Sequence, residues 1–191
     1  MLRIPTKNLR RTATTVLSYV QQTLSAHSTL SVAIVGHSLG AALSLLDGVY
    51  LSLHLGASVN VRVIGYGMPR VGNQDFANWV DSHLGGQVTH INNKGDPIPI
   101  VPGRFLGFHH ASGEVHITDS GTWENCPGEF FSLSGVRLRP FGGVLTRARR
   151  VALFSGQDNT ATLCTVGDVP NLLKGNPSDH HGPYDGIFMG C

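Results

Sequence analysis

The chain has 191 residues, of which 41% are hydrophobic and 14% are charged, and its net charge at pH 7 is +2. This length suits a single domain over residues 1–191, and the composition is too apolar and too weakly charged for a disordered protein. No apolar run reaches the roughly 18 residues of a membrane span, so we expect no stable membrane insertion. The three cysteines are too few for a disulfide scaffold.

The hydrophobic pattern predicts alternating helices and strands in the first half of the chain. Apolar residues at helical spacing predict a helix over 6–26, and helix-forming segments follow at 38–55 and 74–84. Short β-branched runs at 30–35, 59–64 and 88–91 predict buried strands. We therefore expect an α/β fold with a mostly parallel central sheet and helices on both faces.

The sequence changes character after Asn92. Prolines at positions 97, 99 and 102 predict an extended loop, and residues 114–118 with 122–124 predict a short hairpin. Five of the fourteen basic residues lie within 129–155, so the small positive charge belongs to one segment. That segment lacks an aromatic platform or a recognisable binding module, and we expect no nucleic-acid partner and predict no protein partner.

One motif points to chemistry: Gly36-His37-Ser38-Leu39-Gly40, a G-x-S-x-G sequence between a predicted strand and a predicted helix. At such a nucleophile elbow the serine lies on a strained turn, and we expect that only glycine fits at positions 36 and 40. The turn would present the Ser38 hydroxyl and aim the backbone N–H of Leu39 at the oxygen that becomes negative during acyl transfer. The simpler alternative is an ordinary glycine-flanked turn.

A serine nucleophile needs a general base and an acid that orients the base, in the chain order Ser, Asp, His for this kind of elbow. Asp96 follows the predicted strand 88–91, and such groups gather at the carboxyl ends of parallel strands. A turn-forming Asp-Pro is an equally good interpretation of Asp96. His180 and His181 lie late in the chain, and the residues alone make them equally eligible as the base.

These segments resemble the fungal class 3 lipases, secreted triacylglycerol lipases, and their basidiomycete branch in particular. The matching residues are 36–42, 65–73, 89–92 with 96–99, 104–108 with 113–117, and 179–184. The resemblance implies an α/β-hydrolase-like fold with Ser38 as nucleophile, Asp96 as orienting acid and His180 as base. It also implies an oxyanion contact from the Leu39 N–H. The family pattern His-x-Gly-Pro-Tyr favours His180 over His181.

The function that the resemblance implies is a serine esterase, a triacylglycerol lipase acting on lipid esters at an oil–water interface without a cofactor or metal. A feruloyl esterase or a phospholipase of the same fold is the alternative. The resemblance further implies an extracellular protein and a disulfide between Cys126 and Cys164. Metal ligation by the histidines near position 110 is set aside, because the family comparison makes His110 and Glu114 structural hydrogen-bonding groups.

Two features depart from the family pattern. Only 37 residues precede Ser38, so we expect this chain to lack a signal peptide, the N-terminal strands, the lid and the upstream Ser or Thr that gives a second oxyanion donor. A catalytically incomplete fragment with half of the oxyanion hole is therefore a further hypothesis. Residues 129–155 interrupt what is a short loop in the family. We interpret them as a non-family insertion, either a retained intron or a basic surface loop.

Overall fold

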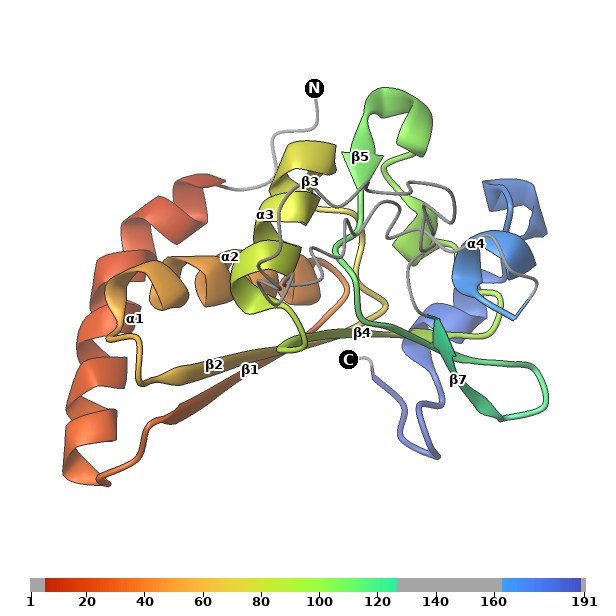
Figure 1. Ribbon diagram of the computed structural model, residues 1–191. Coiled ribbons are helices and arrows are strands. Elements are labelled where there is room, and N and C mark those ends of the chain that lie inside the picture. Colours follow the sequence, from red (N-terminus) through yellow and green to blue (C-terminus); the bar gives the residue numbers. More distant parts are fainter. Residues whose placement is uncertain (1–5, 127–162, 190–191) are drawn as a thin grey trace, which may run out of the picture.

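The computed structural model describes residues 6–126 and 163–189, so the predicted insertion at 129–155 lies outside the described residues. Its centre is a five-stranded sheet in which four neighbouring strands are parallel and the last is antiparallel (Figure 1). In spatial order the strands are β1 (Ser31–His37), β2 (Asn60–Tyr66), β4 (Val88–Asn93), β6 (Glu114–Ile117) and β7 (Trp123–Cys126). The expected mostly parallel sheet and the expected hairpin, β6–β7, are confirmed.

The predicted helices are present with bounds close to those expected from the sequence. They are α1 (Thr6–Ala26), α2 (Leu39–His54) and α3 (Gln74–Leu84). The Asn73 side chain caps α3 by accepting a hydrogen bond from the Phe76 N–H at 3.0 Å, which fixes where this helix begins. Local sequence signals therefore define these elements well.

The proline-containing segment is not the extended loop that the sequence predicts. It forms two 3-10 turns, η1 (Ile98–Ile100) and η2 (Arg104–Leu106). Proline fixes φ at a value that suits the first of them, which contains Pro99. A two-residue antiparallel pairing of β3 (Gly72–Asn73) with β5 (Phe108–His109) lies beside them. The C-terminal part holds α4 (Thr165–Asp168), η3 (Leu172–Lys174) and η4 (Pro177–His181).

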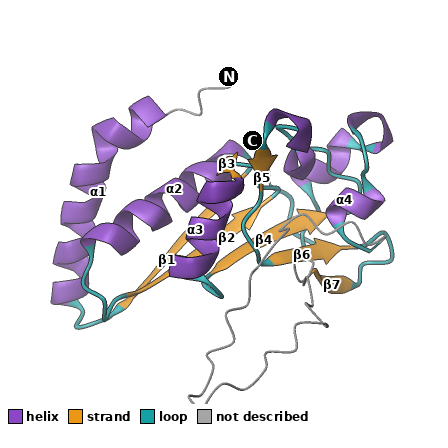
Figure 2. Cartoon of the chain, turned by 45° about the horizontal axis from the view of Figure 1, so that its top comes forward, coloured by secondary structure: helices purple, strands orange, loops and turns teal. Residues whose placement is uncertain are grey.

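The described helices α2 and α3 pack on the same face of the sheet, and α1 lies beside α2 (Figures 1 and 2). Right-handed crossovers that advance in one direction across a sheet place successive helices on the same face, and the order β1-β2-β4 is such an advance. Over β4 and β6 the other face is covered by Tyr184 and Met189, which belong to the core cluster around Ile91. The expected mostly parallel sheet flanked by helices is thus confirmed, with the described helices α2 and α3 on one of its faces.

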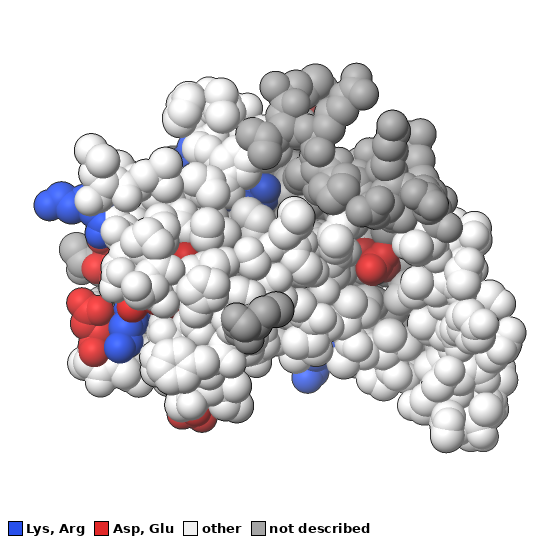
Figure 3. Space-filling view, turned by 180° about the vertical axis from the view of Figure 1, so that it is seen from behind, with Lys and Arg blue, Asp and Glu red and all other residues white. Residues whose placement is uncertain are grey.

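The surface opposite to the view of Figure 1 is largely uncharged. Figure 3 shows its visible Lys and Arg side chains separated from one another rather than gathered in one patch. In the described part of the chain, no helix has the length and apolar character needed to cross a membrane.

Candidate active site

Ser38 lies at the sharp turn between β1 and α2, in a backbone conformation that L-residues rarely adopt. Its φ is 56° and its ψ is −129°, and its N–H donates to the Tyr66 carbonyl at 2.9 Å. Although Ser38 occupies the N-cap position of α2, its hydroxyl does not cap the helix. Strained residues of this kind persist where the surrounding structure holds them, and they cluster at functional sites. The geometry is that of a nucleophile elbow.

The two glycines of the motif have different environments. A Cβ at Gly36 would lie 2.4 Å from the Gly40 carbonyl oxygen and 2.5 Å from the Ser44 Oγ, so only glycine fits there. A Cβ at Gly40 would meet no described atom within 4 Å. The expectation that only glycine fits at position 40 is therefore wrong, because α2 turns that residue toward open space.

Asp96 follows β4 and is fully buried, with 0% of its surface exposed. Its Oδ1 accepts a hydrogen bond from the Ile98 N–H at 2.8 Å, which closes the turn that leads into η1. Its Oδ2 lies 2.8 Å from the Nδ1 of His180. One carboxylate oxygen thus forms the Asp-Pro turn, and the other bonds the histidine.

The structure brings His180, and not His181, to this carboxylate. His180 lies in η4 and is 9% exposed, whereas His181 is exposed and its Nδ1 lies 3.1 Å from the Met189 carbonyl oxygen. Because a carboxylate accepts hydrogen bonds, the Nδ1–H of His180 is the donor, and the neutral ring in this orientation has its lone pair on Nε2. Nε2 is the nitrogen that a general base would use.

The main chain of His180 is held from two sides. Its carbonyl oxygen lies 2.7 Å from the Nε2 of His37, whose ring centroid is 4.6 Å from that of His180. The Tyr184 hydroxyl donates to the same oxygen at 3.3 Å. Burial raises the pKa of Tyr184 above its ordinary value, and the negative charge of Asp96 raises it further. Tyr184 therefore remains a neutral phenol and a donor at neutral pH.

The loop that carries Asp96 and the turn that carries His180 are also joined to each other. The Gly95 N–H donates to the Asp179 carboxylate at 3.1 Å, and the Asn93 amide donates to the Asp179 carbonyl at 2.9 Å. In the reverse direction the Asn176 N–H donates to the Gly95 carbonyl at 2.6 Å. These hydrogen bonds hold the loop of Asp96 and the turn of His180 together, in addition to the hydrogen bond between Asp96 and His180 themselves.

Gly67 is a residue of this site whose role the sequence does not reveal. Its φ is +54°, and a Cβ there would lie 2.8 Å from the Asp96 Oδ2 and 2.9 Å from the His180 Nδ1. Gly67 belongs to the segment 65–73 that resembles the class 3 lipases, but the resemblance does not explain why a glycine occupies this position. The missing side chain is what lets the acid and the histidine meet.

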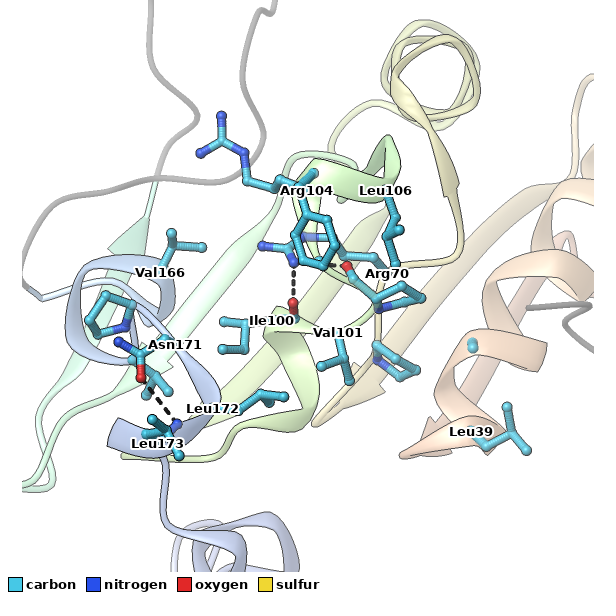
Figure 4. Close-up of a pocket in the computed structure, with 17 residues that line it drawn as sticks. Leu39, Arg70, Ile100, Val101, Arg104, Leu106, Val166, Asn171, Leu172 and Leu173 are labelled. Carbon is cyan, nitrogen blue, oxygen red and sulfur yellow. Dashed lines mark hydrogen bonds between the residues drawn. The ribbon is translucent and has the colours of Figure 1, made fainter. Parts of the chain in front are cut away.

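A mostly apolar cavity of about 860 Å³ lies beside the elbow. Leu39, the residue after Ser38, lines one side of it, and Figure 4 shows the other walls formed by η1, η2 and the α4–η3 segment. Buried Arg70 supports one wall, since its guanidinium donates to the carbonyls of Ile100 and Pro102. Such a volume is within the usual range for binding a small apolar ligand.

The histidines and glutamate near position 110 have structural partners. The Nε2 of His110 lies 2.8 Å from the Pro99 carbonyl oxygen, and the Glu114 carboxylate accepts from the Thr165 N–H at 2.8 Å. Buried His116 lies between the carbonyl oxygens of Leu163 and Lys94, at 2.9 and 3.0 Å. Over residues 6–126 and 163–189, no group of three His, Cys, Asp or Glu side chains is arranged to hold a metal ion.

The expected disulfide between Cys126 and Cys164 is present, with the two Cα atoms 5.8 Å apart. It joins the end of β7 to the residue before α4. The Asn92 amide donates to the buried Thr165 hydroxyl at 2.9 Å just beyond it. Together these contacts fix the α4 wall of the cavity to the central sheet.

Comparison with known proteins gives consistent matches. A family profile described as "Lipase (class 3)" matches residues 3–106. A secreted mono- and diacylglycerol lipase of Malassezia globosa is 35% identical over 117 residues, which are 60% of this chain and 38% of that protein. A second M. globosa enzyme with the same description is 31% identical over 153 residues, covering 80% of this chain and 40% of the relative. The chain therefore spans about two fifths of the length of these curated relatives.

Solved lipase structures share the fold. The triacylglyceride lipase of Rhizomucor miehei superposes with a TM-score of 0.70 at 26% identity, covering 94% of this chain and 56% of that one. The lipase of Rhizopus microsporus var. chinensis gives a TM-score of 0.69 at 26% identity, covering 96% of this chain and 53% of the other. The described architecture is thus of the α/β-hydrolase type.

Proposed function

Because the chain belongs to the class 3 lipase family, we propose that it carries the hydrolytic centre of a secreted enzyme that cleaves the carboxylic esters of acylglycerols. The observation that carries the proposal is the 2.8 Å contact between the buried Asp96 carboxylate and the Nδ1 of His180. A second observation supports it: Ser38 has a strained backbone conformation, and its hydroxyl does not cap α2. An imidazole oriented in this way is the base that a serine hydroxyl needs.

The proposed reaction proceeds in two halves. The Nε2 of His180 takes the proton of the Ser38 hydroxyl as the serine oxygen attacks the ester carbonyl, and it then returns a proton to the departing alcohol. Water repeats the sequence on the acyl-enzyme, which releases the acid and restores Ser38. The Asp96 carboxylate holds the imidazole in the required tautomer and stabilises the imidazolium that forms in each half. No step requires a metal or cofactor.

Stabilisation of the oxyanion is assigned to the N–H of Leu39. As the first residue of α2, Leu39 has an N–H without a partner inside the helix, at the positive end of the helix dipole. A single donor of this kind contributes about 10²–10³ in rate.

The cavity supports an ester with an apolar acyl chain. Its walls include Leu39, Ile100, Val101, Val166 and Val169, and they have little polar surface. The relatives named as mono- and diacylglycerol lipases and as triacylglyceride lipases make acylglycerols the first substrates to try. The relatives named as secreted, together with the disulfide, support an extracellular location.

The direct test is hydrolysis of p-nitrophenyl butyrate by the purified chain and by its Ser38→Ala variant. We expect the variant to lose at least about 10³ in kcat, because in the proposed reaction the Ser38 oxygen forms the acyl-enzyme. Equal rates for the two proteins contradict the proposal and favour a catalytically incomplete chain. Release of fatty acid from mono-, di- and triolein emulsions then ranks the acylglycerol classes.

A further inference from the structure

His116 lies in β6 with 0% of its surface exposed, and both of its ring nitrogens face backbone carbonyl groups. Nδ1 lies 2.9 Å from the Leu163 oxygen, and Nε2 lies 3.0 Å from the Lys94 oxygen. A carbonyl oxygen only accepts hydrogen bonds, and a neutral imidazole donates from one nitrogen alone. Both contacts are therefore hydrogen bonds only when the ring is an imidazolium, with a proton on each nitrogen.

The charges around His116 favour that form. The Asp168 carboxylate of α4 lies 3.7 Å from Nε2. Glu124 is the partner of His116 in the β6–β7 register, and Glu114 lies two residues earlier in β6. Lys94 is the cation of the loop that contacts the ring, and it presents its carbonyl oxygen. Burial opposes a charged ring, and two hydrogen bonds with a carboxylate close by offset that cost.

The Lys94 peptide that His116 contacts belongs to the turn that leads into Asp96. Lys94 has a φ of 45°, in the left-handed region that residues with a side chain rarely adopt. Its N–H donates to the Ile117 carbonyl at 2.7 Å, and its own carbonyl faces the ring of His116. Two consecutive residues of β6 therefore hold both ends of Lys94. Because strained residues persist where the surrounding structure holds them, the position of Asp96 depends on β6.

The other contact of His116 reaches the segment that forms one wall of the cavity. Leu163 precedes Cys164 of the disulfide, and α4 follows, with Val166 and Val169 in the cavity lining. One buried ring thus lies between the turn of the proposed orienting acid and the wall of the proposed acyl site.

We propose that His116 is a positioning residue, an imidazolium that holds the turn of Asp96 and the α4 wall to the same point of β6. Its Nε2–H fixes where the Asp96 carboxylate meets His180, and its Nδ1–H fixes where the α4 wall lies. A charged donor forms a stronger hydrogen bond than a neutral one, which suits a contact that holds a strained turn. The inference rests on the proposed function, because there Asp96 orients the base.

Two substitutions separate the two contacts. The amide nitrogen of glutamine reaches about the position of histidine Nε2, and that of asparagine reaches about the position of Nδ1. His116→Gln therefore keeps a donor for Lys94, and His116→Asn keeps a donor for Leu163. The same two substitutions at His54, an exposed residue at the end of α2, are the matched controls. Thermal denaturation checks that each variant folds.

The first measurement is NMR of the full chain labelled with nitrogen-15, which needs no hydrolysis. At pH 7 we expect both ring nitrogens of His116, assigned by comparing the parent with the variants, to have the chemical shift of protonated nitrogens. A neutral tautomer with one unprotonated nitrogen overturns the inference, and the parent alone decides this point if a variant does not fold.

The same spectra report on the contact between Asp96 and His180. The downfield proton of the His180 Nδ1–H, which bonds Asp96, should keep its chemical shift in His116→Gln and move in His116→Asn. Equal behaviour of this proton in the two variants overturns the inference, and so does an equal movement in the His54 controls.

The second measurement is hydrolysis of p-nitrophenyl butyrate and laurate. His116→Asn should lower kcat on the butyrate at least about tenfold, because a displacement of roughly 1 Å can cost about 10²-fold, and should keep the laurate-to-butyrate ratio of kcat/KM. His116→Gln should keep kcat within about twofold and lower that ratio about threefold. Equal effects of the two variants on both quantities mark a merely structural role and overturn the inference. A parent that gives the expected NMR signals but hydrolyses neither ester contradicts the proposed function and leaves the two hydrogen bonds of His116 standing.

Discussion

The Nε2 of His37 lies 2.7 Å from the main-chain carbonyl oxygen of His180, which joins the elbow of the proposed nucleophile to the turn that carries the proposed base. Because a carbonyl can only accept, His37 donates this hydrogen bond. The His37 ring also lies beside that of His180, tilted by 33° with the centroids 4.6 Å apart. A residue that touches neither acid nor substrate thereby fixes where the imidazole lies relative to Ser38.

Replacing His37 with alanine should lower kcat on p-nitrophenyl butyrate by about three- to tenfold, the equivalent of one such hydrogen bond, with little change in KM. His37→Gln, whose amide nitrogen can reach about the position of Nε2, should restore most of kcat. A merely structural role would instead lower the melting temperature of both variants alike and leave the specific kcat of the folded protein unchanged.

Gly67→Ala should abolish nearly all activity while the fold is retained. The new Cβ would meet the Asp96 Oδ2 at 2.8 Å and the His180 Cε1 at 2.9 Å, so the two side chains must separate. A displacement of about 1 Å can cost about 10²-fold in rate. The matched control is Gly86→Ala, because Gly86 also has a positive φ, +77°, but nothing lies within 4 Å of its Cβ position. If both variants lose activity equally, backbone strain rather than the contact with Asp96 and His180 is responsible.

The elements around the elbow could be predicted because their signals are local. The helical period before Ala26 and the β-branched runs act within a few residues, and each specified an element close to its observed bounds. The choice of face could not be predicted in the same way, because the pattern that makes α3 amphipathic does not determine on which side of the sheet the helix lies. That choice follows from the direction of the crossovers.

The site could be predicted only in part, because its remaining features are contacts between distant segments. Consecutive residues of a 3-10 turn point about 120° apart, so only one of His180 and His181 can face Asp96, and residue type alone does not identify which. The role of Gly67 depends on a histidine that is more than a hundred residues away. The cavity likewise joins the η1–η2 segment to the α4–η3 segment, and no periodicity relates the two.

Asp47 should lower the stability of the fold as the pH rises, which is the opposite of the usual effect of a carboxyl group. It is half-buried in α2, and burial raises its pKa above the ordinary value. A carboxyl whose pKa is higher in the folded than in the unfolded state favours folding when protonated, and this contribution is lost as the pH rises through the folded-state pKa. Asp47→Asn should therefore raise the melting temperature at pH 7 by about 1–2 °C and give no gain at pH 3. Asp119→Asn, at an exposed turn, is the control, and an equal gain there contradicts the assignment.

The Cys126–Cys164 disulfide should stabilise both the fold and one wall of the cavity. It closes a loop with a sequence separation of 38 residues, and restricting the unfolded chain over such a loop contributes about 3–4 kcal/mol. The double variant Cys126→Ser with Cys164→Ser should lose about that much free energy of unfolding in urea titrations.

The effect of this disulfide on substrate choice follows from its position. Cys164 precedes α4, and Val166 and Val169 of the cavity wall follow immediately. Loosening this wall should reduce hydrolysis of a p-nitrophenyl laurate ester more than that of the butyrate, because only the longer acyl chain fills the cavity that α4 and η3 enclose. Measuring the laurate-to-butyrate ratio of kcat/KM separates this effect from a general loss of folded protein, which lowers both rates in proportion. An unchanged ratio would mean that the buried contacts of Thr165 with Asn92 and Glu114 hold the wall without the disulfide.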